Sequence, residues 1–452
     1  MSARAAIILA AGQGTRMKSA KAKVMHAVAG KPILGHVIAA VRGADVSRIV
    51  VVTAPAAHDV RDYAASEGAD SVIQSEQLGT GHAAACAESV LGEFPGVLVV
   101  AYGDMPLVTP DTFERSFAAR ENAGMAIVAF RSPSHAYGRV IVDRDGKLAR
   151  IVEYKDANAD ERKIDLCNAG ILAADAKSFF RWAGALKNDN AQREYYLTDV
   201  PTLAKAERVA CAVIEASEDD MMGVNSRSEL ANAERAMQER LRTRALEAGV
   251  GMIAPETVFL SHDTVLEADV QVGPYVVFAT GVTVRSGAEI KAFSHLEGAE
   301  VGARALVGPY ARLRPGAIIE DDVHIGNFVE VKKARIEKGA KANHLTYIGD
   351  ARVGPGANIG AGTITCNYDG FDKHFTDIGA GAFIGSNTAL VAPVKVKDGA
   401  YVGAGSVITK GVAENALAVT RAEQKSHPGW AEDFRNRKRA EKAGKKKGHG
   451  ER

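Results

Sequence analysis

The stretch VGARALVGPYARLRPGAIIEDDVHIGNFVEV, residues 301–331, decides the fold of the second half of this chain. An aliphatic residue recurs in it at every sixth position: Val301, Val307, Leu313, Ile319, Ile325 and Val331. The same spacing returns at Ile378, Ile384, Leu390, Val396, Val402 and Ile408, and more briefly at Val270, Val276 and Val282. A six-residue aliphatic period is the signature of a parallel β-helix, in which each hexad supplies one short strand and one turn.

An ordinary β-sandwich is the alternative, but it would show alternation with a period of two and irregular turns. The six-residue register is interrupted once, between Thr365 and Ile378, by the segment CNYDGFDKHFTD (366–377). A solenoid accommodates an insertion by looping it outward, and outward loops often form binding sites. We therefore expect residues 366–377 to project from the β-helix.

The first half of the chain has a different pattern. Continuous apolar runs at 5–11, 48–54 and 97–104 are typical of strands buried on both faces of a parallel sheet, and helical stretches at 31–43 and 79–90 lie between them. This alternation predicts a doubly wound, Rossmann-like α/β domain. Ligands of such sheets bind at the carboxyl ends of the strands, where the loops after Ala11 and Tyr102 would lie.

Between the halves, residues 226–248 contain strong helix formers without Gly or Pro and predict one long linking helix. We therefore divide the chain into residues 1–225, the helix 226–248, a β-helix 249–430 and a tail 431–452. The tail holds nine Lys or Arg against four Asp or Glu. We expect it to be disordered.

Composition excludes several classes of protein. The 452 residues are 46% hydrophobic and 25% charged, with a net charge of +1, which excludes intrinsic disorder as the main state. There is no apolar run of 18 or more residues, so we expect no membrane segment. Four dispersed cysteines without a CxxC pair argue against disulfide and zinc frameworks and favour the cytoplasm. The basic excess lies in the tail, so no nucleic-acid partner is predicted.

The segment LAAGQGTRMKSAKAKVMH (9–26) carries the first chemical signal. Gly12 and Gly14 let backbone N–H groups approach a phosphate, and Arg16 and Lys23 add positive charge. A purely structural tight turn would also explain the glycines. Asp104, the last residue of the run at 97–104, is a magnesium ligand or a turn residue on this evidence.

Further motifs follow in a characteristic order: QSEQLGTGHA (74–83), AYGDMPL (101–107), YGRV (137–140), IVEYKD (151–156), NAG (168–170) and GVN (223–225). With LAAGQGTRM they resemble the sugar-1-phosphate nucleotidyltransferases. Together with the β-helix, nearly the whole chain is similar to the bacterial family of bifunctional N-acetylglucosamine-1-phosphate uridyltransferase/glucosamine-1-phosphate acetyltransferases. This resemblance implies that the β-helix of hexapeptide repeats is left-handed. Two departures stand out: Ala22 replaces a common proline, and Ala169 replaces a common threonine.

The resemblance implies a first activity, the Mg²⁺-dependent transfer of uridylyl from UTP to N-acetylglucosamine 1-phosphate. It implies nucleotide contacts from the backbone at Leu9, Ala10, Ala11 and Gly12, phosphate contacts from Arg16 and Lys23, and uracil contacts from Gln74, Gly79 and Thr80. It places Tyr102 and Gly103 in the same site, the sugar against Gly138, Glu153 and Asn168, and Mg²⁺ on Asp104 and Asn225.

The β-helix carries chemistry beyond what hexads need. Arg314, Lys332, His344, Tyr347, Asn358 and Lys373 come from different coils, and their cations suit an anionic sugar phosphate. The resemblance implies acetyl transfer from acetyl-CoA to glucosamine 1-phosphate. Arg314, Lys332, Tyr347 and Lys373 would bind the phosphate, Asn358 the sugar, and His344 would be the general base. Glu330 would orient His344, and Cys366 is interpreted as a bystander.

The resemblance also implies acetyl-CoA contacts from Ala361, Asn367, Tyr368, Ser386, Ala404 and Arg421, and a homotrimer whose loops complete neighbouring sites. The product, UDP-N-acetylglucosamine, would supply peptidoglycan and lipopolysaccharide synthesis. Two alternatives stay open at this point. One is a single-activity nucleotidyltransferase with a structural β-helix, and the other is a non-enzymatic scaffold.

Overall fold

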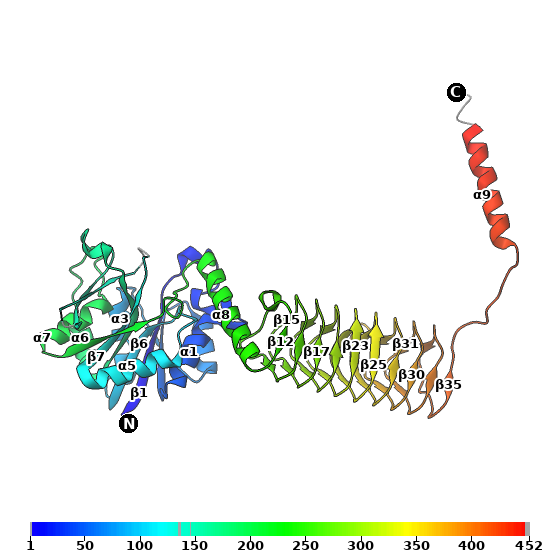
Figure 1. Cartoon of the computed structure of the whole chain (residues 1–452), viewed down its shortest axis with the longest axis horizontal. Helices are drawn as coiled ribbons and strands as arrows, with labels where there is room; N and C mark the ends of the chain where they lie inside the picture. Colours follow the sequence, from blue (N-terminus) through cyan, green and yellow to red (C-terminus); the bar gives the residue numbers. More distant parts are fainter. Residues whose placement is uncertain (1, 134–136, 145, 448–452) are drawn as a thin grey trace. The chain divides into compact units, whose positions relative to one another are not determined.

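The computed structural model describes residues 2–133, 137–144 and 146–447. These residues form two compact units (Figure 1). The first comprises residues up to Val284 together with His295–Gly298, and the second comprises Arg285–Ser294 and the chain from Ala299 onward. The division falls inside the β-helix rather than at residue 249, so the boundary at 249 stays a prediction. Within the described residues, no helix has both the length and the apolar character needed to cross a bilayer.

The first unit is built on a sheet in the order β11-β7-β10-β6-β1-β4-β5. Its strands are β1 (Ala3–Ala10), β4 (Arg48–Thr53), β5 (Asp70–Ile73), β6 (Gly96–Tyr102), β7 (Gly124–Arg131), β10 (Leu166–Asp175) and β11 (Ala210–Ala216). The strands β5, β4, β1 and β6 run parallel, as the apolar runs predict. The strand β10 runs antiparallel to both β6 and β7, so the sheet is mixed rather than wholly parallel.

Two smaller strands, β8 (Arg139–Val142) and β9 (Leu148–Val152), pair with each other at the edge of β10. Apolar side chains cover both faces of the main sheet in two separate clusters. The helices are α1 (Ile33–Gly43), α2 (His58–Ser66), α3 (Thr80–Ala85), α4 (Glu88–Leu91), α5 (Pro110–Ala123), α6 (Ala176–Gly184) and α7 (Val200–Ala206). The helix expected at 79–90 is therefore two short helices, which are separated at Cys86 and Ala87.

The predicted linking helix is α8 (Arg227–Glu247). Ser226 caps it by accepting a hydrogen bond from the Glu229 backbone N–H. Gln238 joins α8 to the first β-helix coil: its Oε1 accepts from the Leu260 N–H at 2.8 Å and its Nε2 donates to the Leu260 carbonyl at 2.7 Å. The first coils therefore belong to the same compact unit as the α/β domain.

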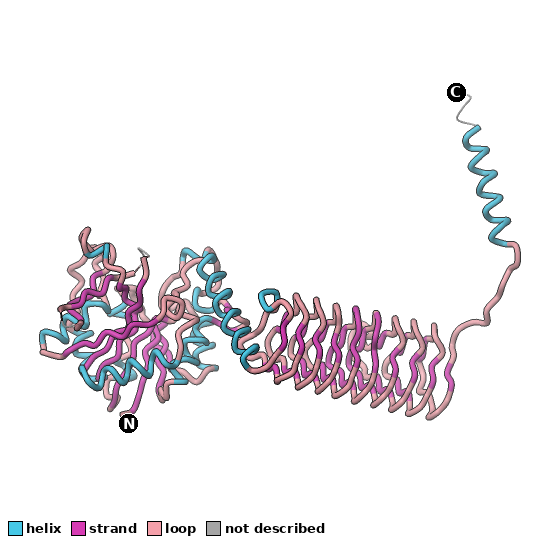
Figure 2. The backbone as a smooth tube through the Cα atoms, in the orientation of Figure 1, coloured by secondary structure: helices cyan, strands magenta, loops and turns pink. Residues whose placement is uncertain are grey.

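The coils of the β-helix are drawn in Figure 2 as stacked turns with short strands. In the first unit they comprise β12 (Gly251–Met252), β13 (Val265–Leu266), β14 (Gln271–Val272), β15 (Val277–Phe278), β16 (Thr283–Val284) and β18 (His295–Leu296). All the strand pairs of these coils that are described are parallel. Every aliphatic residue of the three six-residue runs is buried, which confirms the β-helix expected from the period.

In the second unit one face carries β17 (Glu289–Ile290), β20 (Leu306–Val307), β23 (His324–Asn327), β25 (Lys341–His344), β27 (Asn358–Ile359), β30 (Phe383–Ile384), β33 (Tyr401–Val402) and β35 (Leu417–Ala418). The others carry β19 (Ala299–Val301), β21 (Arg312–Leu313), β22 (Ala317–Ile319), β24 (Glu330–Ile336), β26 (Tyr347–Val353), β28 (Ile364–Cys366), β29 (Thr376–Ile378), β31 (Ala389–Val391), β32 (Val394–Val396) and β34 (Val407–Ile408). The inserted loop lies between two of these strands. Ala351 pairs with Thr376, 25 positions on, whereas Thr376 pairs with Val394, 18 positions on.

The tail does not follow the prediction of disorder, because α9 (Trp430–Lys447) is a helix. Only Gly444 interrupts its helix formers, and the ion pair between Lys438 and Glu441, at 2.7 Å, supports it at i,i+3 spacing. Residues 448–452, which the prediction also covered, lie outside the described part of the chain.

Candidate functional site

A cavity of about 410 Å³ opens at the carboxyl ends of the central strands of the first unit. Ten of the residues expected in the nucleotide site line it: Leu9, Ala10, Ala11, Gly12, Lys23, Gln74, Gly79, Thr80, Tyr102 and Asp104. Four further lining residues were missed: Val24, Gln77, Ala83 and Glu194. Gln77 and Ala83 lie within the quoted motif 74–83, which was the available signal for both.

The loop after β1 is shaped by glycine. Gly14 has φ +61°, and a Cβ there would lie 2.7 Å from the Lys23 Cβ, so only glycine lets Lys23 pack against the loop. Gln77 Nε2 donates to the Ala11 carbonyl at 2.7 Å and holds the loop against the next segment. Arg16 lies apart from the cavity on an exposed 3-10 turn, Thr15–Met17, so the structure does not bring it to the other phosphate-site residues.

Three side chains from distant parts of the sequence meet at Lys23. Its Nζ lies 2.5 Å from Asp104 Oδ2 and 2.8 Å from Asn225 Oδ1. The Val224 N–H donates to the Asp104 carbonyl at 2.9 Å, and the Asn225 N–H donates to Glu229 Oε2 at 2.7 Å, so both segments are tied in place. Asp104 Oδ2 and Asn225 Oδ1 thus converge on the charged amine of Lys23. A divalent cation with few protein ligands needs such a pair of oxygens.

The backbone at Ala22, where relatives commonly have proline, is compatible with proline. Ala22 has φ −55° and ψ 139°, a conformation that proline would also adopt. The effect of this residue on loop rigidity stays a prediction.

The expected uracil residues lie around the start of α3. The Gln74 side chain is buried, and its Nε2 donates to the Gly79 carbonyl at 3.1 Å. Gly79 has φ +110°, and a Cβ there would lie 2.6 Å from the Tyr195 carbonyl oxygen. Thr80 Oγ1 accepts a hydrogen bond from the Leu197 N–H at 3.1 Å, which ties the segment at Leu197 to α3.

The expected sugar residues are brought side by side by strand register. Arg139 pairs with Val152 on β9 and with Cys167 on β10, both antiparallel, so the preceding Gly138 lies between Glu153 and Asn168. The Asn168 N–H donates to the Gly138 carbonyl at 2.8 Å. Burial raises the pKa of Glu153, although its Oε1 accepts a hydrogen bond from Thr198 at 3.1 Å.

Tyr102 connects this sugar region to the cavity that it lines. A Cβ on Gly170, which has φ +74°, would lie 2.2 Å from Tyr102 Cε2, so glycine permits the packing of the ring against β10. Burial, with the nearby Glu153 and Asp104 charges, raises the pKa of Tyr102 and keeps the phenol neutral. Gly103 is buried, and its N–H donates to the Leu9 carbonyl at 2.9 Å.

In the β-helix, cations gather on neighbouring coils. Arg314 Nη1 lies 2.7 Å from Glu330 Oε1, and Glu330 pairs with Tyr347 between β24 and β26. The pKa of Lys332 is lowered by Lys373 and then by Arg314, which means that these three cations are close neighbours. Such a cluster of like charges is suited to a dianionic phosphate.

The partner of His344 differs from the one expected. His344 on β25 lies directly opposite Asn327 on β23, and its Nδ1 is 2.8 Å from Asn327 Oδ1. Glu330 does not orient this histidine, because it lies beyond the turn on β24, where it pairs with Arg314 instead. An amide oxygen only accepts, so this contact fits the neutral tautomer with the proton on Nδ1 and the lone pair on Nε2.

Asn358 lies on β27, next to the strand that carries His344. The residues expected to contact acetyl-CoA follow one edge of successive coils. The Asn387 N–H donates to the Ala361 carbonyl at 2.7 Å, the Gly405 N–H donates to the Ser386 carbonyl at 2.8 Å, and Arg421 Nη1 donates to the Ala404 carbonyl. Asn367 and Tyr368 begin the inserted loop, where Asn367 bonds to Asp350 and the Tyr368 ring is 61% exposed.

Comparison with known proteins finds a different family model in each half of the chain. Residues 6–224 match the model of the MobA-like NTP transferase domain, and residues 298–333 and 375–410 match that of the bacterial transferase hexapeptide. A protein of Paramagnetospirillum magneticum named "Bifunctional protein GlmU" is 52% identical over 98% of both chains. Proteins of the same name from Acidiphilium cryptum and Zymomonas mobilis are 54% and 47% identical, over 95% and 96% of this chain and 98% of their own.

Proposed function

We infer, because the chain belongs to the GlmU family of bifunctional proteins, that it is an enzyme with two active sites. The acetyl site transfers acetyl from acetyl-CoA to glucosamine 1-phosphate. The uridylyl site transfers uridylyl from UTP to N-acetylglucosamine 1-phosphate and releases pyrophosphate. The observation that carries this function is the presence of both residue sets in one chain, one around the 410 Å³ cavity and one on the β-helix.

In the uridylyl site, a phosphate oxygen of the sugar phosphate attacks the α-phosphorus of UTP, and the bond to the β-phosphate breaks. Such transfers ask a protein mainly for positioning and charge neutralisation. Lys23 supplies charge at the cavity, while the N–H groups after β1 are placed for phosphate. Gln74, Gly79 and Thr80 hold the base, and Gly138, Glu153 and Asn168 hold the sugar. Arg16 would contact the phosphates after a movement of its exposed turn toward the cavity.

Asp104 and Asn225 would hold Mg²⁺. Their oxygens are hard ligands, and both lie within hydrogen-bonding reach of the one Nζ of Lys23. A bound Mg²⁺ neutralises charge on the phosphates during transfer.

In the acetyl site, the amine of glucosamine 1-phosphate attacks the thioester carbonyl. A C–N bond forms, the C–S bond breaks and the coenzyme leaves as a thiol. His344 Nε2 takes the proton of the amine, a step worth roughly 10²–10⁴ in rate, and then gives a proton to the departing sulfur. Arg314, Lys332, Lys373 and Tyr347 bind the phosphate, with Asn358 on the sugar. Acetyl-CoA lies along Ala361, Ser386, Ala404 and Arg421, near Asn367 and Tyr368.

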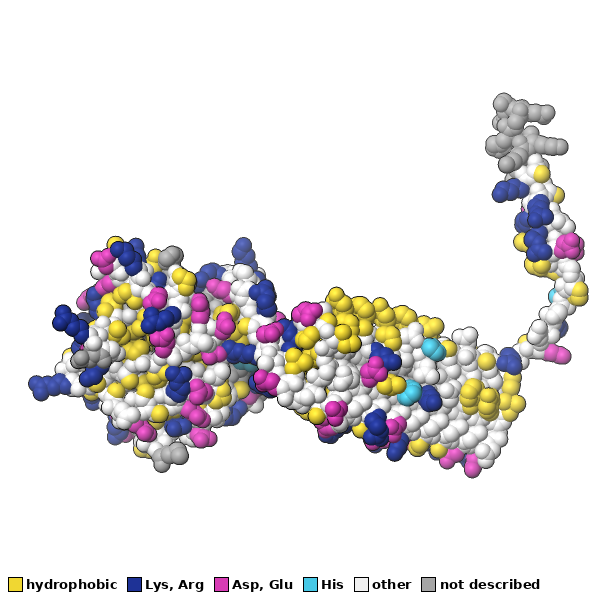
Figure 3. All heavy atoms as spheres, viewed as in Figure 1, with side chains coloured by type: hydrophobic (Ala, Val, Ile, Leu, Met, Phe, Trp, Pro, Cys, Tyr) yellow, Lys and Arg dark blue, Asp and Glu magenta, His cyan; other side chains and the backbone are white. Residues whose placement is uncertain are grey.

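We also propose that the chain forms a homotrimer through one edge of the β-helix. Phe293, Tyr310, Phe328 and Leu345 are 46–62% exposed, and all have φ between 52° and 61°, a strained backbone for bulky residues. The three rings stack with centroids 4.9 and 5.2 Å apart. Figure 3 shows hydrophobic side chains gathered along an edge of the β-helix. Identical copies related by a rotation axis can cover such a strip mutually, next to His344.

The test is mass spectrometry of the products of purified protein with glucosamine 1-phosphate, acetyl-CoA, UTP and Mg²⁺, omitting each in turn. We expect UDP-N-acetylglucosamine from the full mixture and N-acetylglucosamine 1-phosphate when UTP is omitted. Uridylylation of supplied N-acetylglucosamine 1-phosphate without any acetylation would reduce the function to a single-activity nucleotidyltransferase. Light scattering on the same sample tests the trimer, and a cytoplasmic location stays a prediction from cysteine usage.

A further inference from the structure

Arg139 is the largest fully buried side chain in the described part of the chain, with 1% of its surface exposed. A guanidinium is costly to remove from water unless it is well bonded, so its retention in a core calls for a specific reason. It lies at the first position of β8, immediately after Gly138.

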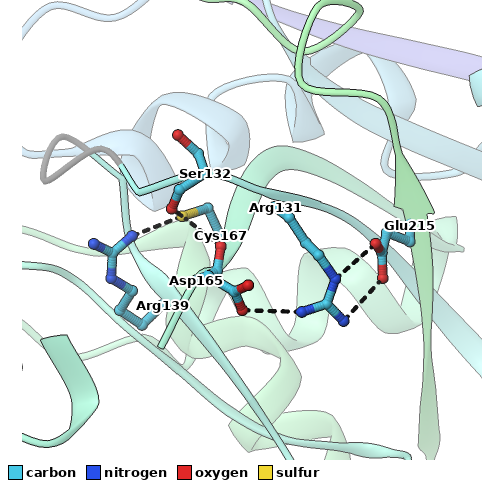
Figure 4. A network of polar contacts seen from close by, with 6 residues as sticks. All are labelled: Arg131, Ser132, Arg139, Asp165, Cys167 and Glu215. Carbon is cyan, nitrogen blue, oxygen red and sulfur yellow. Dashed lines mark hydrogen bonds and ion pairs between the residues drawn. The ribbon is translucent and has the colours of Figure 1, made fainter. Parts of the chain in front are cut away.

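The surroundings of Arg139 come from the two strands on either side. Its Nη1 donates to Cys167 Sγ at 2.6 Å, and its Cζ lies 5.2 Å from the centroid of the Tyr154 ring. Cys167 is itself tied to the residue that follows β7, since its Sγ donates to the Ser132 carbonyl at 3.5 Å. Figure 4 shows Arg139 directed at the Cys167 sulfur, while Arg131 points the other way, to Asp165 and Glu215.

Arg139, Tyr154 and Cys167 are each a chain neighbour of one expected sugar residue. Arg139 follows Gly138, Tyr154 follows Glu153, and Cys167 precedes Asn168. Cys167 and Asn168 are adjacent on β10, so their side chains point to opposite faces of that strand. Gly138 and Glu153 lie at the ends of β8 and β9, level with Asn168 in the register. The position of each sugar residue therefore depends on the packing behind it.

We propose that Arg139 is a positioning residue of the uridylyl site, which sets the spacing of Gly138, Glu153 and Asn168 by bonding to Cys167 and stacking on Tyr154. This inference rests on the proposed function, because it takes those three residues as the sugar contacts. Arg139 touches no substrate in this role. It acts by holding β8, β9 and β10 in one register, and misplacement of a binding group by about 1 Å costs up to a hundredfold.

The experiment measures uridylyl transfer by full-length Arg139→Met and Arg139→Lys, with KM determined separately for N-acetylglucosamine 1-phosphate and for UTP. Arg139→Met is expected to raise KM for the sugar phosphate by about tenfold to a hundredfold. KM for UTP should change less than twofold, because the cluster lies behind the sugar residues. Arg139→Lys keeps the charge without the planar fork and should recover only part of the loss.

Arg131→Met is the matched control. It removes a guanidinium from the same sheet, but one that is more than half exposed and paired to Asp165 and Glu215. It should leave both KM values unchanged. Acetyl transfer by every variant reports on the integrity of the other site.

A uniform rise in both KM values, or an unchanged KM for the sugar phosphate in a folded Arg139→Met protein, would overturn the proposal. If Arg139→Met does not fold, Tyr154→Leu removes the ring on which both Arg139 and Arg162 stack, keeps the bond from Arg139 to Cys167, and must raise the same KM selectively. Asn168→Ala distinguishes a failure of the sugar-site assignment from a failure of the positioning role of Arg139. If it leaves KM for the sugar phosphate unchanged, the site assignment fails, whereas an effect of Asn168→Ala without one of Arg139→Met refutes only the positioning role.

Discussion

The substitution Gly326→Ala should disable acetyl transfer while leaving uridylyl transfer intact. Gly326 lies on β23, opposite Asn343 on the next coil, and it precedes Asn327, which bonds to His344. A Cβ at position 326 would lie 1.9 Å from the Asn343 carbonyl oxygen. This obstacle is backbone, which cannot turn aside as a flexible side chain would.

The expected size follows from that distance. An unstrained contact needs about 3.5 Å, so the two coils would have to separate by roughly 1.5 Å. Overpacking of this kind costs about 1–3 kcal/mol, which lowers Tm by about 2–4 °C per kcal/mol for a domain of this size. The same shift is larger than the tolerance of the 2.8 Å bond between Asn327 and His344. We expect kcat/KM for acetyl transfer to fall by about a hundredfold.

The assay compares acetyl and uridylyl transfer with thermal unfolding of the same preparation. Gly411→Ala is the matched control, because a Cβ there would have only one neighbour, the Lys395 carbonyl oxygen at an ordinary 3.4 Å. It should change neither rate nor Tm. Wild-type acetyl transfer and Tm in Gly326→Ala would refute the argument, since the close coil stacking would then not constrain the histidine.

Three further outcomes are expected. His344→Ala should abolish acetyl transfer and spare uridylyl transfer; a parallel loss of both in an intact oligomer would contradict independent sites. Asp104→Asn should do the reverse, and full Mg²⁺-dependent uridylyl transfer in that variant would remove Asp104 from the metal. Burial lowers the pKa of His36 from 6.5 to about 4. Below pH 6.5 His36 therefore binds a proton in the unfolded chain but not in the folded chain. Folding should lose up to about 3 kcal/mol between pH 6.5 and 4, as urea unfolding would show, and His36→Gln should abolish that component.

Local sequence patterns predicted much of the fold. The β-helix could be predicted because each hexad places an aliphatic residue at the same position. That position points into the core of the coil, which is why Val301 and Ile408 are both buried. The strands β1, β4 and β6 were also predictable, since each is an apolar run that ends in a loop. The helix at 430–447 departs from the expected disorder because its many Ala, Arg, Lys and Glu residues have high helix propensity despite their net charge.

Side-chain partners were less predictable than elements. Glu330 was expected to orient His344 because both belong to recognisable motifs, but the register of the coils places Asn327 opposite the histidine. The antiparallel direction of β10 was likewise hidden, because an apolar strand carries no mark of its direction. One residue of register decides which face a side chain occupies, and turns and bulges set that register.

The sequence by itself determined the two architectures, the loop after β1, the outward insertion and the residue types available for phosphate and acyl chemistry. Each of these depends on residues close together in the chain, whose spacing can be read directly. Only the tertiary structure decided that Lys23 meets Asp104 and Asn225, which are 81 and 202 positions away, and that Arg139 joins Tyr154 to Cys167. Such contacts form when separate strands are packed in one register, and that packing is a property of the whole core rather than of any one segment.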